Sequence, residues 1–67
     1  MTITALNNPN WMEEAKTLLN SRVPFKVHSV TSEMDMQVCR TLANQFNYYL
    51  AFAAPATAVF SPLAKTQ

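Results

Sequence analysis

The sequence of 67 residues contains no glycine, which constrains both its turns and its chemistry. Glycine is the residue that adopts positive φ at no steric cost, so the reversals of this chain have to use other residues. Asn, Pro and Ser are also common in turns. We therefore predict turns at residues 7–9 (Asn-Asn-Pro), 20–21 (Asn-Ser) and 61–62 (Ser-Pro).

The lack of glycine also excludes several catalytic and nucleotide-binding motifs. Phosphate-binding loops and the dinucleotide fingerprint need glycine where the backbone approaches the phosphates, and the nucleophile elbow needs it as well. One histidine and one cysteine, without CxxC or HxxxH spacing, make no recognisable zinc set. We expect a protein that is not an enzyme and that has no cofactor and no metal.

The size and composition predict a single small domain over residues 1–67. The chain is 49% apolar and 13% charged, which is typical of a folded chain rather than a disordered one. Its one cysteine, Cys39, allows no internal disulfide, and so small a domain without a disulfide or metal is marginally stable alone. We therefore expect a homo-oligomer or a protein partner. A net charge of +1 does not favour charge-driven binding to nucleic acid or membranes.

Two segments bear on location. Residues 1–6 have neither a basic start nor an apolar stretch of useful length, so we expect no signal peptide and a cytoplasmic protein. Residues 41–64 contain no charged residue, which leaves a membrane-associated protein as an alternative. Polar residues near the start of that segment and Pro55 in its middle make a spanning helix the less favoured interpretation.

The first half of the chain predicts a strand, a helix and a second strand. Residues 2–6 have the β-branched alternation of a short strand. A helix is expected over residues 9–20, capped by Asn8 and carrying an apolar stripe that begins at Trp11. Residues 23–30 alternate like a half-buried strand, with Lys26 and His28 on its outer side.

The second half predicts a long helix and a final strand. Ser32 followed by Asp35 matches a capping box, and the apolar spacing continues to about Ala54, before Pro55. The last two turns of this helix would be apolar nearly all round and would need cover from outside. Residues 57–60 suggest a strand, parallel to residues 23–30 if the two share a sheet, or else irregular chain. Residues 63–67 are expected to be a flexible tail.

These elements predict an α+β fold in the order β-α-β-α-β, with a long second helix and with the first and last strands least defined. The thiol–imidazole pair Cys39 and His28 is interpreted as a buried structural cysteine and a surface histidine. The carboxylates Glu13, Glu14, Glu33 and Asp35 all fall at predicted helix starts, where they stabilise the helix dipole rather than catalyse.

Aromatic residues supply the favoured binding surface. Tyr48 and Tyr49 are adjacent on the predicted helix, so the two side chains cannot point the same way. Tyrosine and tryptophan are common anchors of protein interfaces. We therefore predict a protein interface that uses Trp11, Tyr48, Tyr49 and Phe52.

Basic residues supply an alternative. Arg22, Lys26, His28 and Arg40 form a small basic set on and around a strand that precedes a helix. This layout resembles the ribbon-helix-helix family, whose paired strands enter the major groove of DNA. That family has a second helix after a short turn, whereas here one helix is expected to run to Pro55. A few charges per subunit also neutralise few phosphates.

The combined expectation is a small non-enzymatic protein-binding module that regulates, links or inhibits a larger protein and forms homo-oligomers. Phages and mobile elements encode many small inhibitors without catalytic residues, and this association favours the same interpretation. The alternatives are a weakly basic nucleic-acid-binding regulator of ribbon-helix type that uses Arg22, Lys26 and His28, and a small membrane-associated protein.

Overall fold

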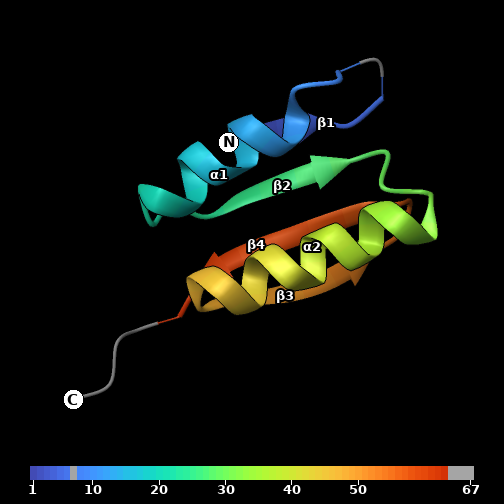
Figure 1. Ribbon diagram of the computed structural model, residues 1–67. Coiled ribbons are helices and arrows are strands. Elements are labelled where there is room, and N and C mark those ends of the chain that lie inside the picture. Colours follow the sequence, from blue (N-terminus) through green and yellow to red (C-terminus); the bar gives the residue numbers. More distant parts are fainter. Residues whose placement is uncertain (7, 64–67) are drawn as a thin grey trace.

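The computed structural model describes residues 1–6 and 8–63. Its elements follow in the order β1 (Thr2–Thr4), α1 (Trp11–Asn20), β2 (Phe25–His28), α2 (Glu33–Phe46), β3 (Tyr48–Ala53) and β4 (Thr57–Pro62) (Figure 1). The predicted α+β class is confirmed, with one more strand than expected.

The four strands form one mixed sheet in the order β1-β2-β4-β3. The β1–β2 pair is parallel, whereas β4 lies antiparallel to both β2 and β3. The expectation that residues 23–30 and 57–60 would pair in parallel is therefore wrong. The reason is the additional strand β3, which forms a hairpin with β4 and reverses the direction in which β4 enters the sheet.

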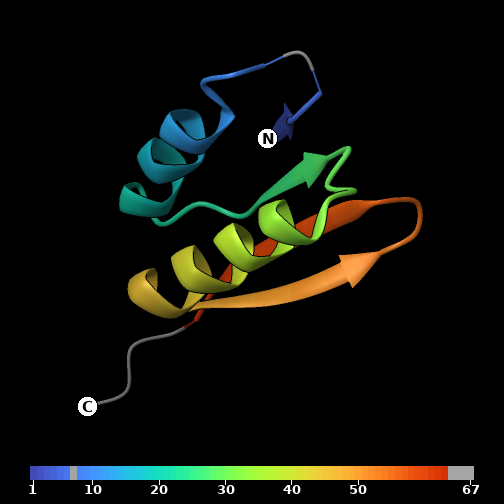
Figure 2. The ribbon, with the colours of Figure 1, turned by 45° about the vertical axis from the view of Figure 1, so that its right-hand side comes forward.

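Both helices cover the same face of the sheet, and no other element within residues 1–6 and 8–63 covers the opposite face, which we call the open face. Helix α1 lies over the β1 end and α2 lies over β3 and β4 (Figures 1 and 2). Alternate strand residues point into the layer between sheet and helices, as the period of two requires. The core contains Ile3, Phe25, Val27, Val30, Tyr48, Ala58 and Phe60 from the sheet side and Trp11, Ala15, Leu19, Cys39, Leu42 and Ala43 from the helices.

The two helix starts differ in how well they were predicted. Ser32 caps α2, because its Oγ accepts the backbone N–H of Asp35 at 3.0 Å. Helix α1 begins at Trp11 rather than Pro9, with Asn10 at the N-cap. Asn8 does not cap the helix, because its side-chain Oδ1 accepts the N–H of Asn10 at 3.2 Å in the preceding turn.

Helix α2 ends at Phe46, well before the predicted end at Ala54. Asn47 adopts the left-handed conformation with φ 60°, and its N–H donates to the carbonyl of Ala43. This is the usual way for an asparagine to end a helix. The segment that looked like an all-round apolar helix is instead strand β3, so it does not need the cover that a helix would.

The C-terminal part of the chain also differs from the prediction. Strand β4 continues through Pro62, so no turn occurs at residues 61–62. The N–H of Leu63 donates to the carbonyl of Asn47 at 3.3 Å. The rest of the tail predicted at residues 63–67 lies outside the described residues.

The uncharged stretch 41–64 contains the end of α2 and the strands β3 and β4 rather than one continuous helix. Among the described residues, no helix combines the length and the apolar character that crossing a membrane requires.

Residues other than glycine occupy the positive-φ positions. Arg22, Ser29, Asn47 and Ala56 have φ between 45° and 65°. Each follows or precedes a helix or strand, where the chain changes direction. For residues that carry a β-carbon, this conformation costs about 1–2 kcal/mol.

This cost leads to a matched pair of serine substitutions. Ser29 has φ 65°, whereas Ser21 at the end of α1 has φ −80°. We expect Ser29→Gly to leave the free energy of unfolding unchanged or to raise it by up to about 1 kcal/mol, because relief of strain offsets the entropy of glycine. Ser21→Gly should lower it by about 0.5–1 kcal/mol. Urea titrations of both variants test this, and equal losses would contradict it.

Candidate protein-binding surface

Strand β3 forms one edge of the sheet, and this edge is open. Its six residues pair with β4 along their whole length, from Tyr48 opposite Pro62 to Ala53 opposite Thr57. On its other side, β3 has no strand partner within residues 1–6 and 8–63. The strand contains neither a charged residue nor a proline, and these are the devices by which natural proteins usually protect an edge.

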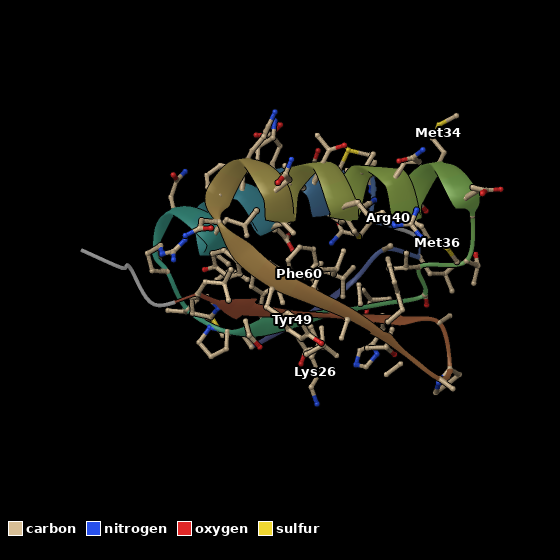
Figure 3. All side chains as sticks on the ribbon, turned by 90° about the horizontal axis from the view of Figure 1, so that it is seen from below. Lys26, Met34, Met36, Arg40, Tyr49 and Phe60 are labelled. Carbon is tan, nitrogen blue, oxygen red and sulfur yellow. The ribbon has the colours of Figure 1, made fainter. Side chains whose placement is uncertain are left out.

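Two aromatic side chains are exposed beside this edge. Tyr49 is 57% exposed on the open face of the sheet, and Figure 3 shows it on the same side as Lys26. Phe52 is 42% exposed and points to the helix side, where the Arg40 guanidinium lies 5.4 Å from its ring centroid. We call the free edge of β3 together with Tyr49 and Phe52 the β3 strip.

The other two predicted interface residues lie in the core. Trp11 opens α1 and is buried against the sheet. Tyr48 is also buried, with its ring edge-on to Phe25 and Phe60 and its hydroxyl 3.0 Å from the carbonyl oxygen of Val23. Burial raises the pKa of Tyr48. Of the four predicted residues, the structure therefore leaves Tyr49 and Phe52 accessible to a partner.

The Arg22 side chain makes its contacts within the fold. Its guanidinium donates to the carbonyl oxygens of Phe46, Asn47 and Leu63, and it stacks over the Tyr48 ring at 4.9 Å. It thereby ties the end of α1 to the end of α2 and to the end of β4.

The remaining basic residues do not gather around Arg22. Lys26 and His28 alternate onto the open face of the sheet, and His28 Nδ1 lies 3.1 Å from Thr57 Oγ1. Arg40 lies on the helix side of the sheet (Figure 3). Strand β2 is paired on both sides, by β1 and by β4, so it offers no free edge of the kind that ribbon-helix-helix dimers use.

A groove between the two helices was not predicted from the sequence. It has a volume of about 360 Å³ and is lined partly by Met12, Met34, Val38 and Leu42. Met34 is 76% exposed, and methionine adapts to varied partner surfaces. Met12 lies outside the apolar stripe of its helix and was a signal for this groove, whereas Met34 falls on the spacing of Val38 and Leu42 and gave none.

Cys39 is buried in the core, as predicted. Burial, with a smaller contribution from the negative charge of Asp35, raises the pKa of its thiol from 9.0 to about 11. A thiol that resists ionisation is a poor nucleophile. The carboxylates of Glu13, Glu14 and Glu33 lie in the first turns of the two helices, where they favour helix formation.

The raised pKa of Cys39 predicts a loss of stability in alkali. The unfolded chain ionises this thiol near pH 9, whereas the folded protein holds the proton to about pH 11. The contribution of the thiol is therefore complete below pH 9 and is lost as the pH rises toward 11. In urea titrations, Cys39→Ala should lose less stability than the wild type between about pH 8 and about pH 10.5. Tyr48 is present in both proteins, so equal losses would contradict the prediction.

The described residues contain no group of three or more His, Cys, Asp and Glu side chains that could hold a metal ion. No protein-family model, no curated protein and no solved structure matches the chain.

Proposed function

We propose that the chain is a small non-enzymatic protein-binding module that regulates, links or inhibits a larger protein in the cytoplasm. The observation that carries the proposal is the open edge of β3, uncharged over six residues and flanked by exposed Tyr49 and Phe52. A partner would bind by adding a strand to this edge, with main-chain hydrogen bonds for affinity and the two rings for contact area.

The β3 strip is preorganised for the addition of a partner strand. The ladder with β4 holds all six residues of β3 extended, so little conformational entropy is lost when a partner strand is added. The Arg40 guanidinium lies 5.4 Å from the centroid of the Phe52 ring, so one face of this ring already has a contact in the single chain. Tyr49 combines a large apolar ring with a polar tip, as interface residues often do.

Affinity capture from the cells that produce the protein tests the proposal. We expect a protein that is retained by the wild type and lost with Tyr49→Lys, because a lysine adds a charge and removes the aromatic ring. Met34→Lys is the matched control, since it places the same charge on an exposed apolar position in the groove between the helices. Calorimetry with the purified partner should show the same difference.

Two results would contradict the proposal. Retention of the same protein by Tyr49→Lys would remove the β3 strip as the binding surface. Loss of the protein with Met34→Lys alone would move the binding surface to the groove between the helices.

A second candidate function is weak binding of single-stranded nucleic acid by the open face of the sheet. The observation that favours it is the exposure of Lys26, His28 and Tyr49 on this one face. Four-stranded sheets in RNA-binding domains stack bases on such exposed aromatic residues. This function predicts a gel shift at low salt that weakens steeply with added salt and is lost with Lys26→Ala.

A further inference from the structure

We propose that the β3 strip binds a second copy of the chain, so that two β3 strands pair antiparallel about a twofold axis and join the two sheets. This inference rests on the proposed function, because it takes the β3 strip as a protein-binding surface, and a second copy would compete with the larger protein for the same edge. An eight-stranded sheet with two helices over each half would result.

The two edges of the sheet differ in a way that selects β3. The other edge strand, β1, has only three residues, and short edge strands are poor templates for pairing. Strand β3 has six residues in a continuous ladder with β4. It also has no charge that would meet its own copy across a twofold axis.

The pairing register follows from which side chains share a face. Tyr48, Leu50 and Phe52 point toward the helices, and the residues between them point to the open face. Two antiparallel strands keep their faces only when residues of the same face lie opposite each other. The two such registers with the longest overlap place the twofold axis at Leu50 or at Ala51.

Charge distinguishes the two registers. An axis at Leu50 would set Phe52 opposite Tyr48 of the second copy. Arg40, which lies over Phe52, would then approach Arg22 of the second copy, which lies over that Tyr48 ring. An axis at Ala51 separates the two guanidinium groups by two more residues along the strand. Like charges repel, so we favour the register centred on Ala51.

Side-chain sizes in this register are complementary. On the open face, Tyr49 lies opposite Ala53 of the second copy, and Ala51 lies opposite its own counterpart. On the helix side, Phe52 lies opposite Leu50, which is half-buried in the single chain. Each exposed ring would thus cover a smaller or half-buried side chain, and dimer formation would bury the two rings that the monomer leaves exposed.

Sedimentation equilibrium from micromolar to submillimolar concentrations tests the inference. The wild type should reach twice the monomer mass of 7.5 kDa. Ala51→Lys should remain monomeric, because it places two lysines opposite each other at the axis. Thr4→Lys is the matched control, since Thr4 is exposed on the open face at the other edge strand, and this variant should still dimerise. Circular dichroism checks that each variant is folded.

A second variant tests the register through the formation of a covalent dimer rather than through the loss of dimerisation. Residues directly opposite in antiparallel strands have Cα atoms about 4.5–5.5 Å apart, a distance that a disulfide can bridge. Ala51→Cys should therefore oxidise to a covalent dimer, whereas Thr4→Cys should not. A monomeric wild type, or an Ala51→Lys variant that still dimerises, would overturn the inference.

The outcome separates the dimer from the proposed function. A monomeric wild type that still loses a captured protein with Tyr49→Lys would overturn the dimer alone. A β3-dependent dimer that binds no larger protein would support the dimer and would overturn regulation of a larger protein.

Discussion

Replacing Phe60 with alanine is expected to lower the free energy of unfolding by about 3–5 kcal/mol. The Phe60 ring is fully buried between the sheet and α2 (Figure 3), stacks on Phe25 at 4.6 Å and meets Tyr48 edge-on. A chain of this length has a total stability of about 3–10 kcal/mol. The variant should therefore lose most of its cooperative unfolding transition, as followed by circular dichroism in urea.

Phe52→Ala is the matched control. It removes the same ring from the same side of the sheet, but this ring is 42% exposed and contacts Arg40 rather than the core. We expect a loss of less than about 1.5 kcal/mol. If Phe52→Ala cost as much as Phe60→Ala, the described core would be wrong.

Replacing Arg22 with alanine is expected to lower the free energy of unfolding by about 2–3 kcal/mol. A hydrogen bond to a charged group contributes about 1.5–3 kcal/mol, and the Arg22 guanidinium reaches the carbonyls of Phe46, Asn47 and Leu63. Alanine retains the β-carbon, so the strain of φ 58° at this position is the same in both proteins. Urea titration measures the loss.

Two controls accompany this prediction. Arg40→Ala removes an exposed guanidinium that lies over the Phe52 ring, and it should cost about 0.5–1 kcal/mol. Arg22→Lys should not restore stability fully, because an ammonium group cannot reproduce the planar array of donors that spans three carbonyls. Equal losses for Arg22→Ala and Arg40→Ala would show that Arg22 does not tie the helix ends together.

The start of α2 and the first two strands were predictable because local signals set them. Ser32 and the acidic first turns mark α2, and the alternation of Phe25 and Val27 marks β2. The end of α2 was not predictable in the same way. Leu42, Phe46, Tyr49 and Ala53 follow a three- or four-residue spacing, so the apolar pattern fits a helix that continues to residue 53. The actual end depends on the left-handed conformation of Asn47, which the apolar pattern does not reveal.

The candidate surface was predictable in part. Aromatic enrichment identified Tyr49 and Phe52, but it could not separate them from Trp11 and Tyr48, since all four are large and amphipathic or apolar. The separation depends on the change from helix to strand at Tyr48, which sends alternate side chains to opposite faces. The open edge of β3 depends on strand order, which long-range pairing decides and local sequence does not.

Photo-crosslinking in the native cells tests most directly the central claim that the β3 strip is a protein-binding surface. A photoreactive phenylalanine analogue would replace Tyr49 in one sample and Glu14, which is exposed on α1, in another. We predict covalent adducts with protein from position 49, either with a second copy of the chain or with a larger protein, and none from position 14. Adducts from position 14 alone, or none from position 49, would contradict the account.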